Sequence, residues 1–226
     1  KETIVSIFVN PKQFNNKNDY KKYPRNLRKD LKILKRLKVN YVYIPTKKQI
    51  FNSKNPIIIR LSQKDKILCA KYRKGHFEGV IDVMTRLVKK IKPAKIFMGE
   101  KDFQQFILVK RFIEKNFQSK IILCKTIRNK NKLALSSRNL HLSKNALIVA
   151  EKISRNLISF KKQISQQPLK KKKILSKKNE LTKKFHIDIE YFEVRDINNL
   201  LISKKMDNSK IFIAYYLNKI RLIDNF

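Results

Sequence analysis

The sequence is short of glycine, cysteine and acidic residues, and it has no tryptophan. Its 226 residues include three Gly, two Cys and 17 Asp plus Glu, against 55 Lys plus Arg. Cys69 and Cys124 lack the paired spacing and the companion His cluster that a disulfide framework or a zinc site requires. Neither G-x-G-x-x-G nor G-x-x-x-x-G-K-[ST] occurs, so the standard dinucleotide and P-loop motifs are not supported.

Long apolar runs are also lacking. The run IFIAYYL at 211–217 is far too short to cross a bilayer. No secretory signal opens the chain, which already reads as a strand at Thr3. We therefore expect a soluble, cytoplasmic protein with no membrane partner.

What the sequence has in abundance is positive charge, with a formal net charge of +38. Such a charge suggests nucleic acid, because Lys and Arg that neutralise phosphates dominate that kind of binding. Only 12 of the basic residues are Arg, however, although Arg has the fork that grips phosphates and bases. Lys, Asn and Ile number 43, 20 and 30, and all three have A/T-rich codons. Codon drift therefore explains the charge better than a nucleic-acid partner does.

Strand and helix patterns alternate through the first part of the chain. The run TIVSIFV at 3–9 is apolar on both faces, as a buried parallel strand would be. Leucines recur at helical spacing from Leu27 to Leu37. The remaining expected elements are strands at 39–44, 94–98 and 120–124 and helices at 76–91 and 102–115. This order predicts an α/β fold with a Rossmann-like, doubly wound parallel sheet over residues 1–142.

The second part has a different texture. A helix is expected from residue 143 to 157, and the basic, glycine-free stretch 161–179 suggests a poorly packed surface helix or a linker. Two strands at 187–194 and 210–217 follow, and the segment RLIDN comes after them. These patterns predict a smaller C-terminal α+β domain over residues 143–226.

Polar segments follow several of the predicted strands, where a doubly wound sheet binds its ligands. Gly99 would let the backbone turn sharply into a helix whose free N–H groups, with Lys101, could hold phosphate. Asp102 and Gln105 also fit a capping box, which needs no ligand. Ser136, Ser137 and Arg138 could bind phosphate oxygens, although serine clusters are commonest in turns.

A further polar cluster surrounds Gly75, which would allow a turn. His76 opens a helix there, and such a residue is more often a cap or a surface residue than a catalyst. The cluster alone therefore leaves its role open.

Taken together and in order, these segments closely resemble the pantothenate synthetase family. The matching runs are VSIFVNPKQF (5–14), YPRNLRKD (23–30), YRKGHFEGV (72–80), GEKDFQQ (99–105), LALSSRN (133–139), YFEVRD (191–196) and RLIDN (221–225). The resemblance implies a cytoplasmic C–N ligase that joins pantoate to beta-alanine through a pantoyl-adenylate and releases AMP and pyrophosphate. It also implies ATP as substrate, Mg²⁺ as cofactor, a homodimer, and a C-terminal lid beside an ATP- and pantoate-binding domain.

The resemblance also implies roles for individual residues, none of them a metal ligand. Gln13 would bind pantoate and beta-alanine, Gln105 would bind pantoate, and Arg73 and His76 would lie near the pocket. The catalytic residues would be Lys101, Ser136, Ser137 and Arg138. The ATP site would comprise Gly99, Glu100, Lys101, Asp102, Ile127, Leu135, Ser136, Ser137 and Arg138.

Two departures from the family pattern stand out. The family's first strand and helix, with a two-His nucleotide motif, are absent from these residues, so the expectation includes a truncated, inactive relic. Lys132 replaces the glycine before LALSSRN, which is tolerable where that position needs no positive φ. A basic nucleic-acid-binding protein on the same fold is the other alternative.

Overall fold

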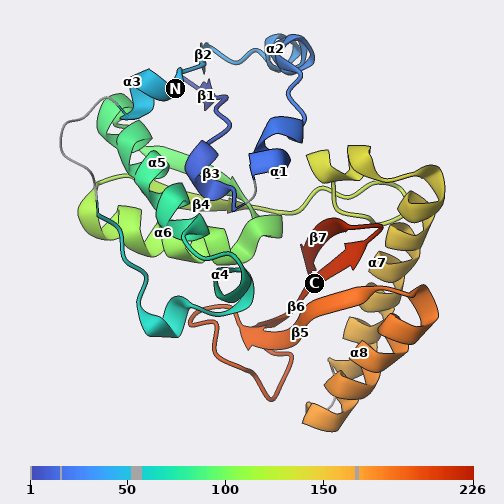
Figure 1. Ribbon diagram of the computed structural model, residues 1–226. Helices are drawn as coiled ribbons and strands as arrows, with labels where there is room; N and C mark the ends of the chain where they lie inside the picture. The colour runs from blue at the N-terminus through green and yellow to red at the C-terminus, as the bar shows by residue number, and fades with distance from the viewer. Residues whose placement is uncertain (1, 16, 52–57, 166–167) are drawn as a thin grey trace. The chain divides into compact units, whose positions relative to one another are not determined.

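A computed structural model describes residues 2–15, 17–51, 58–165 and 168–226, in two compact units (Figure 1). Unit 1 comprises Lys1–Ile96 and Leu108–Lys120, and unit 2 comprises Phe97–Ile107 and Ile121–Phe226. These bounds follow backbone contacts, and the predicted domain boundary at residues 142 and 143 stays a prediction. Of the helices in the described part of the chain, none has both the length and the hydropathy that crossing a membrane requires.

Unit 1 contains short strands and mostly short helices. Their bounds are β1 Ile4–Ser6, η1 Pro11–Gln13, α1 Lys17–Lys22, α2 Leu27–Arg36, β2 Tyr41–Tyr43, α3 Lys47–Phe51, η2 Gln63–Asp65, α4 Leu68–Tyr72 and α5 His76–Ile91. Along the chain, β3 Lys95–Gly99, α6 Phe103–Asn116 and β4 Lys120–Cys124 each pass from one unit into the other. Strand and helix alternate as the sequence predicted.

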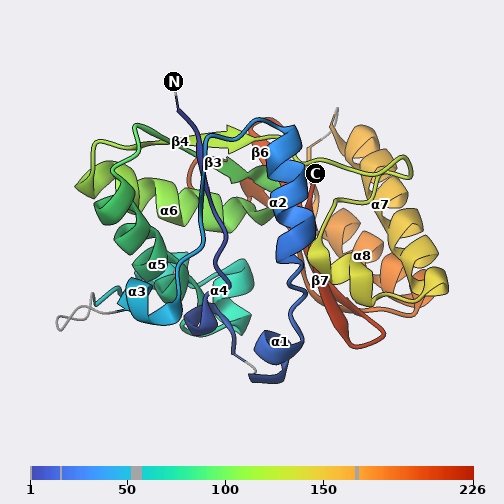
Figure 2. The same cartoon turned by 90° about the horizontal axis from the view of Figure 1, so that it is seen from above.

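Strands β1 and β2 run side by side and parallel, with Ile4 opposite Tyr41 (Figure 2). The parallel strand is therefore confirmed, but the prediction that it is buried on both faces is wrong. Ile4 is 41% exposed and Tyr41 is 53% exposed, and no β1 residue is fully buried. In the described part of the chain, the sheet formed by β1 and β2 has two strands, so much of both its faces is left open.

Helix α5 follows the predicted apolar pattern closely. Its inward side chains recur at i, i+3 and i+4, and those that are buried include Phe77, Val80, Ile81, Leu87 and Val88. Gly75 precedes the helix with φ of 77°, a left-handed conformation that confirms the expected turn.

Gly79 lets α5 approach the chain that follows β1. A Cβ at this position would lie 2.6 Å from the Lys12 carbonyl oxygen, so a larger residue would push η1 away. The buried Asn10 side chain completes the contact by donating to the Gly79 carbonyl at 2.9 Å. This close packing fixes the backbone just before Gln13.

Unit 2 is built on an antiparallel sheet in the order β5-β6-β7, covered by two long helices (Figure 1). The bounds are η3 Glu100–Asp102, η4 Ser137–His141, α7 Lys144–Ile164, α8 Lys171–Phe185, β5 Asp188–Asp196, β6 Ser209–Leu217 and β7 Ile220–Asn225. The largest described core cluster joins α7 and α8 to this sheet. It gives unit 2 a rigid base.

The prediction of a poorly packed stretch at 161–179 is wrong for its described residues. Ile164 and Leu169 are buried in the core cluster of unit 2, and residues 166–167 lie outside the described chain. Leu181, just beyond the stretch on α8, is also fully buried. The many lysines made these buried residues hard to recognise in the sequence. Long basic side chains extend outward, while the single apolar residues among them point inward.

Candidate active site

The residues that the sequence singled out fall into two sets, one in each unit. Gln13, Arg73 and His76 lie in unit 1, and the segment 99–105, Ile127 and the segment 135–138 lie in unit 2. Each set has its own network of hydrogen bonds.

In unit 1 the Gln13 carbonyl is the centre of the network. It accepts hydrogen bonds from Arg73 Nη2 at 3.0 Å and from His76 Nδ1 at 2.7 Å. Arg73 Nη1 also lies 3.0 Å from His76 Nε2. Because a guanidinium can only donate, Nε2 accepts, and the imidazole proton resides on Nδ1. The structure thus brings Gln13, Arg73 and His76 together.

This geometry decides between the interpretations of His76. Its side chain is 7% exposed and both ring nitrogens are engaged, so the surface interpretation is wrong. Each ring nitrogen has a partner within the protein. His76 therefore holds the Gln13 backbone, while the Gln13 side chain stays half-buried and makes no hydrogen bond to the described residues.

In unit 2, Gly99 does not make the predicted sharp turn. Its φ and ψ are −71° and 134°, an ordinary extended conformation, and a Cβ there would meet nothing within 4 Å. The chain changes direction instead through η3, the single 3₁₀ turn that follows. Lys101 lies on that turn, with its side chain 18% exposed and its ammonium 3.9 Å from Asp102 Oδ1.

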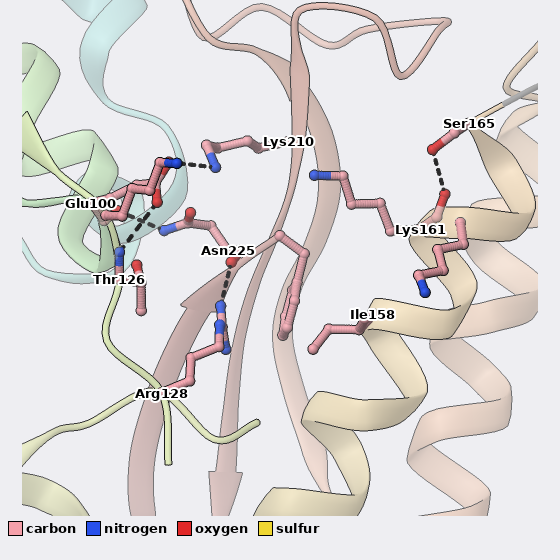
Figure 3. A pocket seen from close by; sticks show the side chains of 11 residues that line it. Glu100, Thr126, Arg128, Ile158, Lys161, Ser165, Lys210 and Asn225 are labelled. Carbon is pink, nitrogen blue, oxygen red and sulfur yellow. Dashed lines mark hydrogen bonds and ion pairs between the residues drawn. The ribbon is translucent and has the colours of Figure 1, made fainter. Parts of the chain in front are cut away.

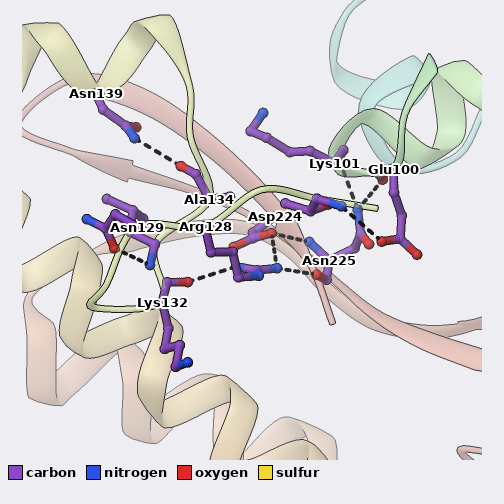
Figure 4. Close-up of polar contacts among 11 residues, drawn as sticks. Glu100, Lys101, Arg128, Asn129, Lys132, Ala134, Asn139, Asp224 and Asn225 are labelled. Atoms are coloured by element: carbon purple, nitrogen blue, oxygen red, sulfur yellow. Dashed lines mark hydrogen bonds and ion pairs between the residues drawn. The ribbon is translucent and has the colours of Figure 1, made fainter. Parts of the chain in front are cut away.

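The η3 turn is fixed by the last strand of the chain. The Asn225 side-chain amide donates to the Glu100 carbonyl at 2.8 Å and to the Lys101 carbonyl at 2.9 Å (Figure 4). Asn225 is 3% exposed. Because the buried Asn225 side chain donates to two consecutive carbonyls, it fixes the backbone of η3, from which the Lys101 side chain extends.

The Glu100 carboxylate has partners of its own, different from the partner of the Glu100 carbonyl. Lys210 Nζ lies 2.8 Å from Oε1, and the Thr126 amide donates to Oε2 at 3.3 Å (Figure 3). Burial raises the pKa of Glu100, but the Lys210 ammonium and the Thr126 amide outweigh it and the net pKa is lowered. Glu100 is therefore ionised at neutral pH and forms an ion pair with Lys210.

A second anchor joins Arg128 to the same strand. Its Nη1 and Nη2 donate to the two Asp224 oxygens at 2.7 and 2.9 Å, and Nη2 also donates to the Asn225 carbonyl at 2.9 Å (Figure 4). Burial raises the pKa of Asp224, and the Arg128 guanidinium lowers it in part. This bidentate pair ties the chain at Arg128 to the end of β7.

The segment around the two serines is held in a similar way. The Leu135 amide donates to the Ile127 carbonyl at 2.9 Å, and the side chains of both residues are mostly exposed. Ser136 Oγ caps η4 by accepting from the Arg138 amide at 3.3 Å. Arg138 Nη1 donates to the Arg221 carbonyl of β7, also at 3.3 Å. Both predicted phosphate-binding segments thus contact the same strand.

Lys132 lies in the loop between these segments with φ of 73°. We expected lysine to be tolerated in place of glycine here where the position needs no positive φ. The backbone at Lys132 is left-handed, so lysine is strained at this position. The loop is nevertheless held firmly. The buried Glu151 accepts from Asn129 Nδ2 and from Asn131 Nδ2, each at 2.8 Å.

Sequence reasoning gave no role to Arg128, Asp224 or Asn225. RLIDN was part of the resemblance, but its function as the support of two loops depends on contacts up to 125 positions apart. One signal in the sequence could have indicated their role. Asp224 and Asn225 are two adjacent polar residues that directly follow the apolar residues of a predicted strand.

Comparison with known proteins covers the whole sequence. The profile of the pantoate-beta-alanine ligase family matches residues 1–226. Pantothenate synthetase from Francisella tularensis subsp. novicida (strain U112) is 38% identical over 227 residues, covering 99% of this chain and 78% of that protein.

Solved structures agree with the family match. Pantothenate synthetase from Thermus thermophilus gives a TM-score of 0.92 at 27% identity, covering 100% of this chain and 83% of the other. Pantoate-beta-alanine ligase from Francisella tularensis, complexed with beta-gamma ATP and beta-alanine, gives 0.80 at 36% identity, covering 100% and 79%. These matches confirm the predicted α/β fold and the resemblance.

Proposed function

Because the chain belongs to the pantoate-beta-alanine ligase family, we propose how its residues divide the work of that reaction. The enzyme condenses pantoate with beta-alanine, forms a C–N bond and uses ATP as substrate. The single observation that carries the assignment of roles is that η3 and η4 are both bonded to β7. One rigid strand therefore supports both segments proposed to hold ATP.

The first step joins pantoate to AMP. A pantoate carboxylate oxygen attacks the α-phosphorus of ATP, and the bond to pyrophosphate breaks. Negative charge grows on the phosphoryl oxygens and on the leaving pyrophosphate, where Lys101 and Arg138 would stabilise it. Ser136 and Ser137 would supply hydroxyl and backbone donors to the same phosphates. Gly99, Glu100, Asp102, Ile127 and Leu135 would line the rest of the ATP site.

The second step forms the amide. The beta-alanine amine attacks the acyl carbon of pantoyl-adenylate, the bond to AMP breaks, and the amine loses a proton. Gln13 and Gln105 would orient pantoate, and Gln13 would also bind beta-alanine. The half-buried Gln13 side chain supports this role, since Arg73 and His76 already hold its backbone.

Mg²⁺ would enter with ATP and offset the charge of its phosphates. Among the described residues no group of three or more His, Cys, Asp or Glu could hold a metal ion. A nucleotide-bound Mg²⁺ takes most of its ligands from phosphates and water. The residues proposed around those phosphates remain Lys101 and Arg138.

The remaining assignments concern assembly and organisation. We propose a homodimer, and the exposed Leu27 and Leu31 on one face of α2, at 42% and 37%, support a protein partner. We also propose a cytoplasmic enzyme, which two free cysteines support. Residues 1–142 would bind ATP and pantoate, and residues 143–226 would form the lid.

The test is pantoate-dependent exchange of pyrophosphate into ATP by the protein expressed from its full reading frame. Replacing Lys101 with Ala should lower the exchange rate roughly a hundredfold, because a preorganised charge at the phosphates is lost. Gln105→Ala should raise the KM for pantoate. Lys152→Ala, an exposed position on α7, should leave both values unchanged.

Each outcome has a clear meaning. Exchange that Lys101→Ala leaves intact would remove Lys101 from the ATP site. A folded protein that shows no exchange would favour the relic over the enzyme. Tight, strongly salt-dependent RNA or DNA binding by that inactive protein would favour the nucleic-acid alternative.

A further inference from the structure

The loop that precedes Ser136 is held by a buried carboxylate on α7. Glu151 is 7% exposed, and its neighbour Ala150 belongs to the core cluster of unit 2. Glu151 Oε1 accepts from Asn129 Nδ2 and Oε2 accepts from Asn131 Nδ2, each at 2.8 Å. The carboxylate thus joins the rigid base of unit 2 to the loop.

The partners of this carboxylate are unusual for a buried charge. Buried carboxylates are commonly compensated by a cation, because a charge loses much of its hydration on burial. Among the described residues no Lys, Arg or His lies within ion-pair distance of Glu151, and its partners are two neutral amides. Apolar side chains of similar size often stabilise such a contact as well or better. What they cannot supply is a fixed orientation of the two amides.

The orientation of the Asn129 amide decides the shape of the loop. Its Nδ2 is directed to Glu151, and its Oδ1 accepts from the backbone amides of Asn131 and Leu133, each at 3.0 Å. The Asn129 amide closes the same turn by donating to the Leu133 carbonyl at 2.9 Å. Reversing the Asn129 side chain would place a donor against two backbone N–H groups. Glu151 therefore selects the one orientation that closes the turn.

The backbone of this turn is strained, and the strain shows how firmly the turn is held. Lys132 has φ of 73°, which is unfavourable for a residue with a Cβ, and its amide donates to the Asn129 carbonyl at 2.9 Å. Such a backbone persists only where its surroundings over-determine it, and strained residues are concentrated near functional sites. The surroundings here are the Asn129 side chain and, through it, Glu151.

The turn leads directly into the segment proposed to hold ATP. Leu133 is buried in the core cluster of unit 2, and the Ala134 carbonyl accepts from Asn139 Nδ2 at 3.0 Å (Figure 4). The backbone amide of Leu135 is bonded as well, and Ser136 follows at once. The chain thus has no slack in which a displaced turn could be absorbed before Ser136.

We infer that Glu151 is a positioning residue for the nucleotide, acting through the Asn129 amide on the segment 136–138. The inference rests on the proposed function, which places ATP against that segment. In this role Glu151 acts on the loop and not on the substrate, and small misplacements of groups that orient a substrate are costly to catalysis. Pantoate, proposed to bind Gln13 and Gln105, does not depend on this loop.

The test measures ATP affinity by calorimetric titration and KM values by pantoate-dependent exchange, with the protein expressed from its full reading frame. Glu151→Gln should weaken ATP binding roughly tenfold, because its new amide group faces the Asn131 donor where an acceptor stood. Asn131→Asp should weaken ATP binding more, since two carboxylates then face each other. The KM for pantoate should stay unchanged in both variants.

The double variant Glu151→Gln/Asn131→Asp restores a donor opposite each acceptor. The glutamine amide group can donate to the new carboxylate, and its oxygen can still accept from Asn129. This variant should therefore recover most of the lost ATP affinity. The control Glu180→Gln removes one charge from an exposed position of α8 in the same unit, and it should leave ATP affinity and both KM values unchanged.

Rescue of ATP affinity separates positioning from a merely structural role, which would change thermal stability alone. Parental ATP affinity in folded Glu151→Gln would overturn the inference. So would a double variant that binds ATP no better than Asn131→Asp, or a KM for pantoate that rises with the KM for ATP. If a single variant does not fold, a folded double variant must bind ATP as the parent does.

Failure of the proposed function has a different signature. A parent protein that binds ATP but shows no exchange would refute the proposed reaction, and the ATP affinities of the variants would still decide the role of Glu151. A folded parent that binds no ATP would overturn both.

Discussion

Asn225 donates its side-chain amide to the backbone carbonyls of both Glu100 and Lys101, at 2.8 and 2.9 Å. One buried side chain near the end of the chain therefore fixes the turn that carries the Lys101 ammonium. The contact gives Asn225 a positioning function in the proposed ATP site, since it acts on the backbone and not on the substrate.

Loss of this donor should weaken ATP binding. Asn225→Ala should raise the KM for ATP roughly tenfold, because the η3 turn loses both hydrogen bonds. Asn225→Asp has nearly the same shape but places a carboxylate against two carbonyls, so its effect should be larger. Steady-state kinetics with ATP varied at saturating pantoate measures this. A loss of thermal stability with an unchanged KM would show that Asn225 is only structural.

The Arg128–Asp224 pair should behave as a buried ion pair. Arg128→Met leaves the Asp224 carboxylate buried without its partner and should lower the free energy of unfolding by about 3–5 kcal/mol. The double variant Arg128→Met/Asp224→Leu should recover part of that loss, because no charge is then left unpaired. Urea unfolding at neutral pH measures both. Additive losses in the double variant would contradict the coupling.

Lys132 should be replaceable with a gain in stability. Its φ of 73° is costly for a residue with a Cβ and free of strain for glycine. Lys132→Gly should therefore raise the free energy of unfolding by about 1 kcal/mol. Lys130→Gly, in the same loop but without a positive φ, should have no effect or destabilise. If both changes have the same effect in urea unfolding, the backbone conformation is not the cause.

The Glu100–Lys210 pair should make stability depend on acid. The folded-state pKa of Glu100 is lowered from its ordinary 4.5, so its contribution is fully present above that value. It is lost as pH falls from 4.5 through the lowered folded-state pKa. Lys210→Met should reduce stability at neutral pH and flatten this acid dependence.

The matched control for that change is Lys205→Met, whose pair with Asp207 spans 3.9 Å with both side chains more than 70% exposed. It should change stability little at any pH. Urea unfolding of both variants and the parent across the acid range provides the comparison. An unchanged acid dependence in Lys210→Met would show that Glu100 is not the group responsible.

Local patterns predicted much of this fold. The apolar spacing of α5 gave the helix and the residues that it buries, since both follow from a period of 3.6. The same reasoning gave α2 its helix, but α2 buries none of its residues. Amphipathic spacing shows that an apolar face exists, and it does not reveal what covers that face.

The sequence indicated which segments belong to the candidate site. It did not indicate which residues hold those segments in place. Short motifs predicted Lys101 and Arg138 as site residues, and this stays a prediction. Asn225 and Asp224 act through contacts between distant parts of the chain. Gly99 illustrates the opposite error, because glycine permits a left-handed backbone without requiring one. Lys132 has the left-handed backbone that the identity of its side chain would not suggest.

The dependence of η3 and Arg128 on β7 has a consequence for how the protein is made. Asn225 follows residues 100 and 101 by 125 and 124 positions, so that length of chain must still be made before the group that holds them is available. The proposed ATP site can therefore take its final geometry only after β7 has paired with β6. Catalytic competence should arise as one of the last events of folding, well after the separate helices have formed.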